Sequence, residues 1–554
     1  MKTSIASCIF LALLVSSLSA QSVLISGQLL DKDTDEAIPY ASLRVAGTGV
    51  GTVSNILGEF SLSIPISSIH QRLQISCLGY ADQEIPLSSF REAEKKIILL
   101  KEQTFTLDEV VIYSTDVTAK ELLELAFEHV KDNYPQKGYL LNTFYRHYCK
   151  EGNVYGRLIE AAIDLYDKKG YRKPVKNPSK KFGVKFKQLR RSVDFTSISG
   201  FSHSAHALPV VLRMDVVGYK NFQVFAEKEP KNIDFFFEDT TYFQGEVVYV
   251  VRAESKKPSY HHTMDFYISA DNFAILRYEQ VSNSSHTFKS TTTSWKGKHV
   301  FNYQLYQGKY YLEHSLDEAR RITQERDSLG QIIHTSDHFH HVELMVNEIQ
   351  TQHFQKVDGE MPTESTLAAI PYDPNFWNNY TVLQATPLEQ GIKQDLEARI
   401  SLEDQFSGDD RTGQLSEIQD ELMSQKLERM LTINTNQPTL LCFWDSHYKP
   451  GLKELLFARK LAKEYGETDI RVRLIFISLD RNEADWDAAI RKYRLYAGQH
   501  MRLAKGVNAG IARKYGVTGS PYFVLMDKRQ NIIIQGAELP KRSHIDDLMG
   551  RLGD

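Results

Sequence analysis

Residues 440–451 constrain the fold more than any other segment of this 554-residue chain. Four apolar residues, 440–443, lead into Trp444, and a polar turn then reaches Pro450. A short apolar run is typical of a buried strand, and proline suits the first turn of a helix because its missing N–H would have no partner there. The segment therefore predicts a strand that turns directly into a helix, as in α/β domains.

A second segment, residues 517–527, complements this corner. Its Gly519, Ser520 and Pro521 precede the apolar run 522–526. Together with the helix and strand patterns around them, the two segments resemble the thioredoxin-like domain of the periplasmic TlpA-type family over residues 431–554. The resemblance implies an α/β domain in which Pro521 follows a cis peptide bond and faces the turn after Trp444.

The redox chemistry of that family needs two cysteines, separated by two residues, in the turn. At the corresponding positions this chain carries Tyr448 and Gly451. Neither residue can form a thiolate, so the turn lacks both the nucleophile and the resolving sulfur of thiol–disulfide exchange. We therefore regard Tyr448 and Gly451 as degenerate redox-motif positions and expect no catalytic residue here.

Residues next to this turn offer two other possible sources of catalytic chemistry. Cys442 could act as a nucleophile, but it lies within the apolar strand, where a buried thiol has a raised pKa and behaves as a small hydrophobic side chain. Asp445, Ser446 and His447 supply the residue types of a catalytic triad. However, three successive residues rarely reach the geometry that triads assemble from distant segments.

The length of the chain predicts three or four domains, because a single core does not grow to this size. The formal net charge of −4 gives no reason to expect a nucleic-acid partner. Residues 1–20 have the features of a secretory signal peptide, whose apolar run is too short to span a bilayer. No run of 18 or more apolar residues occurs elsewhere in the chain. We expect an exported protein, in the periplasm or associated with the outer membrane, without a transmembrane segment after signal cleavage.

Short alternating strands separated by turn residues fill residues 21–104. The segments SGQLLD (26–31), IPYASLRVAGTGVGTVSN (38–55) and GEFSLSIP (58–65) are similar to the carboxypeptidase regulatory-like domain found in exported Bacteroidetes-type proteins. That resemblance implies a transthyretin-like β-sandwich of about seven strands without a peptidase centre. A linker is expected over residues 105–118.

Residues 119–375 begin with an amphipathic helix and continue mainly with strand patterns. They predict a central, mainly antiparallel β domain with helices, whose large curved sheet would form a half-barrel. Residues 376–430 are predicted to be a helical connector. The chain is thus expected to be multidomain, with a β-sandwich first, a central β domain next and an α/β thioredoxin-like domain last.

Two polar clusters of the central domain are candidate binding sites. A basic stretch could contact an anionic partner or could simply be a solvated surface; its members are Lys180, Lys181, Lys185, Lys187, Arg190 and Arg191. His338 and His340 would project from one face of a strand and are weak metal-ligand candidates. Since one strand cannot complete a tetrahedral site, we expect no metal and no cofactor.

The favoured interpretation is a non-enzymatic binding or scaffold protein of the cell envelope. Its thioredoxin-like corner would hold an extended peptide or an unidentified partner protein, with the backbone of Ser520 forming strand-like hydrogen bonds beside Pro521. Trp444 and Tyr448 would supply apolar contact to that partner. The alternative is an enzyme, namely a thiol–disulfide oxidoreductase or peroxidase that acts in cell redox homeostasis.

Overall fold

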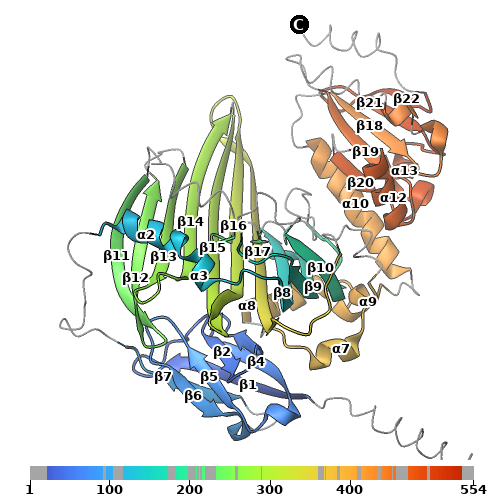
Figure 1. Ribbon diagram of the computed structural model, residues 1–554. Helices are drawn as coiled ribbons and strands as arrows, with labels where there is room; N and C mark the ends of the chain where they lie inside the picture. Colours follow the sequence, from blue (N-terminus) through green and yellow to red (C-terminus); the bar gives the residue numbers. More distant parts are fainter. Residues whose placement is uncertain are drawn as a thin grey trace, which may run out of the picture.

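The computed structural model describes most of the chain. The described residues are 22–90, 95–103, 117–172, 181–196, 208, 211–212, 215–218, 233–255, 260–288, 290–359, 367, 370–383, 387–408, 413–432, 438–451, 453–456, 472–493, 495 and 499–538. They form a small β module, a large central sheet and a separate α/β domain, in that order along the chain (Figure 1). The expected signal peptide and nearly all of the expected linker lie outside the described residues.

Alternating apolar residues build the N-terminal module as two packed sheets, with strand orders β4–β1–β7 and β3–β2–β5–β6. Its elements are β1 (Ser22–Asp31), β2 (Ser42–Val45), β3 (Gly51–Val53), β4 (Glu59–Pro65), η1 (Ile66–Ser68), β5 (Arg72–Ser76), β6 (Gln83–Pro86), η2 (Leu87–Ser89) and β7 (Lys96–Leu100). Phe60, Leu62 and Ile64 alternate along β4 and are fully buried in the core of the module. The predicted seven-stranded sandwich is confirmed.

The central domain is one antiparallel sheet of ten described strands, in the order β10–β9–β8–β17–β16–β15–β14–β13–β12–β11. The strands are β8 (Tyr139–Glu151), β9 (Val154–Asp167), β10 (Phe182–Arg191), β11 (Ile233–Phe243), β12 (Glu246–Ser255), β13 (Tyr260–Ser269), β14 (Ile275–Phe288), β15 (Thr291–Tyr306), β16 (Lys309–Arg326) and β17 (Ile332–Gln350). The sheet curves strongly (Figure 1), with β10 and β11 at its two ends. The predicted large, curved antiparallel sheet is confirmed.

The two faces of this sheet are covered differently. The helices α2 (Ala119–Glu128) and α3 (Val130–Asn133) cross one face (Figure 1), where Leu122 and Leu123 join Phe266 and Leu344 in the main apolar core. The side chains of Phe144, Ala162 and Met345 instead pack with Trp377 and Leu383. Because both faces are covered, successive residues of a central strand are buried, as in β8, where all of residues 139–149 are buried.

The N-terminal module is held against the central sheet by close backbone approach and buried polar contacts. The amide of Ile349 donates to the carbonyl of Gly49 at 3.0 Å, and a β-carbon on Gly49 would lie only 2.2 Å from the carbonyl oxygen of Ile349. Glycine is therefore required at this position. Ser42 hydrogen-bonds to Glu313, and Nε of Arg44 lies 3.4 Å from the same carboxylate.

Between the central sheet and the last domain, the described residues form four helices. They are α7 (Pro374–Asn379), α8 (Pro387–Leu396), α9 (Leu402–Ser407) and α10 (Gln414–Thr432). Ile392 and Leu396 of α8 pack on Tyr155 and Leu158 of β9. Leu427, Met430 and Leu431 at the end of α10 pack in the core of the last domain. In the described ranges, every helix is too short or too polar to cross a membrane.

The last domain is a five-stranded mixed sheet with the order β20–β19–β18–β21–β22. Its elements are β18 (Thr439–Trp444), β19 (Arg473–Ser478), α12 (Glu483–Lys492), β20 (Gln499–Arg502), η4 (Gly506–Asn508), α13 (Gly510–Lys514), β21 (Tyr522–Met526) and β22 (Ile532–Gly536). β18, β19 and β20 run parallel, whereas β21 is antiparallel to β18. Separate apolar clusters contain alternate residues of β18, so this predicted apolar strand is buried on both faces.

Candidate functional site

The turn after β18 faces the start of β21. The Ser520–Pro521 peptide bond is cis. A β-carbon on Gly451 would lie 2.9 Å from Oγ of Ser520, 3.3 Å from Cδ of Pro521 and 3.2 Å from Cδ1 of Tyr448. The structure thus brings together Tyr448, Gly451, Ser520 and Pro521, which we call the proline corner.

No cysteine among the described residues lies at the proline corner. The three described cysteines are Cys77, Cys149 and Cys442, and all are free thiols. Cys442 is fully buried opposite Phe476 and Phe523 of the neighbouring strands, and this burial raises the pKa of its thiol far above the ordinary value. A thiolate is therefore strongly disfavoured at the one cysteine of this domain.

Trp444 does not line the proline corner. Its side chain is fully buried with Leu455, Phe476 and Leu495. The prediction that Trp444 contacts a bound peptide is wrong, because strand alternation turns it to the same inner face as Leu440 and Cys442. Tyr448 is 46% exposed, so it remains available as an aromatic contact.

The backbone of Ser520 is oriented by the turn. Its Oγ accepts a hydrogen bond from the amide of Asp445 at 3.0 Å. Pairing of β21 with β18 begins only at Tyr522, which lies opposite Phe443. Within the described part of the chain, the N–H and C=O of Ser520 make no hydrogen bond of their own. As far as the described residues go, these two groups are therefore available to pair with an added strand.

A polar cluster lies beside the proline corner. Oγ of Ser446 is 2.7 Å from Oδ1 of Asp480 and 3.3 Å from Nδ1 of His447. The shorter contact assigns the hydroxyl proton to Asp480, so Ser446 and His447 are not arranged as nucleophile and base. Sequence reasoning missed Asp480, although it follows β19, whose carboxyl end meets that of β18 at one edge of the sheet.

The basic stretch of the central domain lies mainly beside acidic residues. Three of its members form ion pairs with carboxylates on β9: Lys181 with Asp167 at 3.0 Å, Lys187 with Asp164 at 2.9 Å and Arg190 with Glu160 at 2.5 Å. Lys181 is buried, contrary to the prediction of a solvated or partner-binding cation, because its ammonium group is needed next to the buried Asp167.

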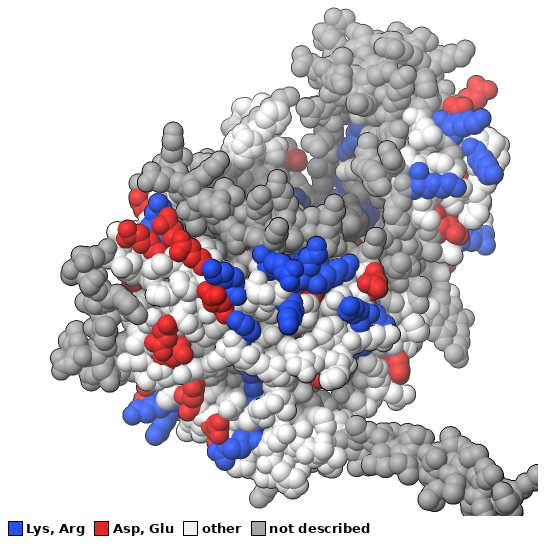
Figure 2. All heavy atoms as spheres, viewed as in Figure 1, with Lys and Arg blue, Asp and Glu red and all other residues white. Residues whose placement is uncertain are grey.

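The remaining members of the basic stretch are placed differently. Lys180 lies outside the described residues, Arg191 is half-buried, and Lys185 is exposed at a groove that Asn142 and Gln350 also line. Lysine and arginine side chains gather near the middle of the view in Figure 2, with acidic side chains around them. Among the described members of the basic stretch, Lys185 is the exposed cation for which no ion pair is formed, so it is the one open to an anionic partner.

His338 and His340 share one face of β17 but have separate partners. Nδ1 of His338 lies 3.4 Å from Glu151, and Nε2 of His340 lies 3.3 Å from Asp317. In the described ranges, neither belongs to a group of three side chains close enough to share a metal ion; that spacing occurs at Asp445, His447 and Asp480.

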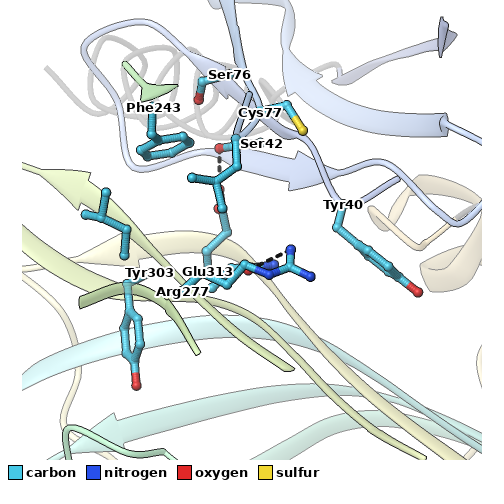
Figure 3. Close-up of a pocket in the computed structure, with 11 residues that line it drawn as sticks. Tyr40, Ser42, Ser76, Cys77, Phe243, Arg277, Tyr303 and Glu313 are labelled. Carbon is cyan, nitrogen blue, oxygen red and sulfur yellow. Dashed lines mark hydrogen bonds between the residues drawn. The ribbon is translucent and has the colours of Figure 1, made fainter. Parts of the chain in front are cut away.

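A small cavity lies between the N-terminal module and the central sheet. Figure 3 shows Ser42 and Cys77 of the module next to Phe243 and Glu313 of the sheet. Its volume is about 40 Å³, which is room for no more than a few ordered water molecules. The cavity is therefore too small for a ligand larger than a few water molecules.

Two family models match parts of the chain. The CarboxypepD_reg-like domain model matches residues 25–112, and a thioredoxin-like model matches residues 436–532. The chain thus carries a regulatory-like β-sandwich near its N-terminus and a thioredoxin-like domain near its C-terminus. A comparison with curated proteins found no match.

Solved structures with similarity to the last domain include three from Bacteroides. A thiol-disulfide oxidoreductase from Bacteroides fragilis is 23% identical over 21% of this chain and 82% of that chain, with a TM-score of 0.19. The thioredoxin domain of a thiol-disulfide oxidoreductase from Bacteroides vulgatus is 24% identical over 22% and 81%, with a TM-score of 0.17. A thiol:disulfide interchange protein from Bacteroides sp. is 21% identical over 22% and 76%, with a TM-score of 0.19.

Proposed function

We propose that this protein is a non-enzymatic binding protein of the cell envelope, and that its proline corner holds an extended segment of a peptide or partner protein. One observation carries the proposal: the corner is assembled around Pro521, yet Tyr448 and Gly451 occupy its redox positions. The signal-like residues 1–20 support export to the periplasm or to the outer membrane.

The corner offers both backbone and side-chain contacts to such a segment. The N–H and C=O of Ser520, which make no hydrogen bond to any described residue, lie just before β21, so a peptide can pair with them as an added strand. Gly451 has no side chain, which leaves the edge of Pro521 open, and Tyr448 adds an exposed aromatic ring beside it. Backbone pairing would provide general affinity, and the ring would select apolar side chains.

We expect the substitution Tyr448→Ala to weaken peptide binding by at least about tenfold, or about 1.4 kcal/mol, because aromatic residues dominate binding energy at small interfaces. Peptides would be selected on the full chain from a phage-displayed library of random linear sequences, and their affinity measured by fluorescence anisotropy. The matched control is Ile532→Ala, since Ile532 is 47% exposed, lies in the same domain and pairs with Met526 at the far end of β21.

The contribution of the Ser520 backbone can be tested on the ligand instead of the protein. A selected peptide, N-methylated one residue at a time, should lose affinity at the position that donates to Ser520, and the protein fold stays untouched. The proposal fails if Tyr448→Ala and Ile532→Ala bind every selected peptide as tightly as the wild type does.

The enzymatic alternative makes the opposite prediction. We expect no insulin reduction and no peroxide turnover by the full chain, and no change on Cys442→Ser, because the Cys442 thiol is buried and has no second thiol beside it among the described residues. A thioredoxin with two active-site cysteines serves as the positive control. Turnover that disappears in Cys442→Ser would show that the protein is a thiol enzyme and that our proposal is wrong.

A further inference from the structure

His447 has carboxylates next to both nitrogens of its ring. Nδ1 lies 3.4 Å from Oδ1 of Asp445 and 3.5 Å from Oδ1 of Asp480, and Nε2 lies 3.6 Å from Oδ2 of Asp485. A neutral imidazole has only one N–H, so one nitrogen must direct its lone pair at a carboxylate. This arrangement is unfavourable unless a cation, either a second ring proton or a metal ion, lies between them.

The buried carboxylate of Asp480 would also be stabilised by a nearby positive charge. Its side chain is fully buried, and its carboxylate accepts hydrogen bonds from the neutral hydroxyl groups of Ser446 and Ser478. Among the described residues, His447 is its one ion-pair partner. Because a buried carboxylate is costly without a counter-charge, a cation next to Asp480 would stabilise this edge of the domain.

The distances at Nδ1 distinguish a metal ion from a proton. An N–H···O hydrogen bond usually has a donor–acceptor distance of about 2.7–3.2 Å, which is shorter than both carboxylate contacts here and shorter than the 3.3 Å from Nδ1 to Oγ of Ser446. Two donor atoms at about 2.0–2.1 Å from one tetrahedral zinc ion are instead separated by about 3.4 Å. The three donor atoms of Asp445, His447 and Asp480 all lie within 4.8 Å of one another. We propose that these three residues form a binding site for a divalent transition metal of the zinc class.

Asp485 supports this proposal independently of the three ligands. Metal-bound histidines usually donate their other N–H to a carboxylate, which fixes the tautomer and orients the ring. Asp485, near the start of α12, lies 3.6 Å from Nε2; this is longer than a hydrogen bond, but its negative charge favours a proton on Nε2 and so leaves the Nδ1 lone pair for the metal. One imidazole and two carboxylates suit Zn²⁺, Co²⁺ or Mn²⁺ better than a thiol-preferring ion such as Cu⁺.

The site would keep one position open. Three protein ligands leave the fourth position of a tetrahedral ion to water or another oxygen donor. The His447 side chain is 70% exposed, so the open position faces solvent close to Tyr448. The metal ion would therefore offer a positively charged coordination site, next to the proline corner, to an oxygen donor of a bound peptide.

The test uses the full chain without a polyhistidine tag, and the probes are Zn²⁺ and Co²⁺ alone. Zn²⁺ binding is measured by competition with a chromophoric chelator, and Co²⁺ coordination by its visible absorption. The variants are His447→Ala and Asp485→Asn. The matched control is His261→Ala, because His261 is also exposed and lies 3.4 Å from one carboxylate, that of Glu254, but has no second ligand in the described structure.

We expect the wild type and His261→Ala to bind one Zn²⁺ per chain and to give intense Co²⁺ bands of low coordination number. His447→Ala should lose this site, and Asp485→Asn should weaken it by about tenfold or more. Circular dichroism should show unchanged folding, since His447 is mostly exposed. The proposal is overturned if the wild type binds no Zn²⁺, or if His447→Ala binds it with the affinity and stoichiometry of the wild type.

Discussion

Replacing Glu160 with alanine should destabilise the central domain by about 3–5 kcal/mol, because it removes one partner from a buried ion-pair network. Glu160 of β9 lies between two arginines on the neighbouring strands, 2.7 Å from Arg146 and 2.5 Å from Arg190. Burial alone would raise the pKa of Glu160, but the two guanidinium groups overcome this effect and hold the pKa below its ordinary value. Without Glu160, Arg146 would remain charged inside the sheet.

The control for this substitution is Glu84→Ala. Glu84 pairs with Arg72 at 2.8 Å, but both side chains are about half exposed, and exposed pairs of this kind contribute little to stability. Thermal and urea unfolding would be followed by tryptophan fluorescence, since the ring of Trp377 lies 4.4 Å from the guanidinium of Arg190 and reports on this region. Removing Arg146 as well, in Glu160→Ala/Arg146→Met, should recover part of the loss. A similar small effect of Glu160→Ala and Glu84→Ala would contradict the burial argument.

The same network shows why the basic stretch was hard to interpret from sequence. Its cations occur without an intervening acid along the chain, so they appear unpaired. Their partners come from β9, where antiparallel pairing places Glu160 opposite Arg190 and brings Asp164 to Lys187. Local charge counts cannot reveal a neutralisation that depends on strand register.

More of the fold than of the ion-pair network could be predicted from the sequence, because the sequence patterns of the strands are local. Phe60, Leu62 and Ile64 alternate within β4, and the continuous apolar run of β18 marks a strand covered on both faces. The proline corner was also predictable, since its two segments match a known pattern. The side to which Trp444 points was not, because alternation relates it to Cys442 but does not say which face meets the corner.

The metal-site candidate shows a second limit of sequence reasoning. Asp445 and His447 were visible in the turn, but Asp480 and Asp485 lie far along the chain, at the end of β19 and in α12. They join the turn only because β18 and β19 run parallel, with Trp444 opposite Ser478. Sites at the carboxyl edge of parallel strands therefore need the strand order, which single-sequence patterns do not supply.

The stability of the central domain should fall as pH rises from 6.5 to 9, because a buried histidine loses its proton. Burial alone would lower the pKa of His341, but hydrogen bonds to the carboxylates of Glu318 and Glu343 raise it to about 9. The ring also stacks on Tyr148, with centroids 4.5 Å apart. His341 is thus protonated in the folded protein under conditions where it is neutral in the unfolded chain.

The sign follows from the two pKa values of His341. Its folded value of about 9 exceeds the ordinary value of 6.5, so its contribution is complete below pH 6.5 and is lost as pH rises through 9. At about 1.4 kcal/mol per tenfold change in proton affinity, the loss is about 3 kcal/mol. Glu343 acts in the opposite direction: hydrogen bonds from His314 and His341 overcome its burial and hold its pKa well below 4.5, so its contribution disappears on acidification.

The measurement is the free energy of unfolding in urea at intervals between pH 5 and 9.5, for the wild type and for His341→Phe. Phenylalanine keeps the ring stacked on Tyr148 but cannot take up a proton, so this variant should be less stable at pH 6 and should lose most of the decline above pH 6.5. In the control His261→Phe, which removes an exposed histidine, the decline should remain. If the wild type and His341→Phe weaken in parallel above pH 6.5, the proton on His341 does not stabilise the sheet, and other groups must cause the alkaline loss.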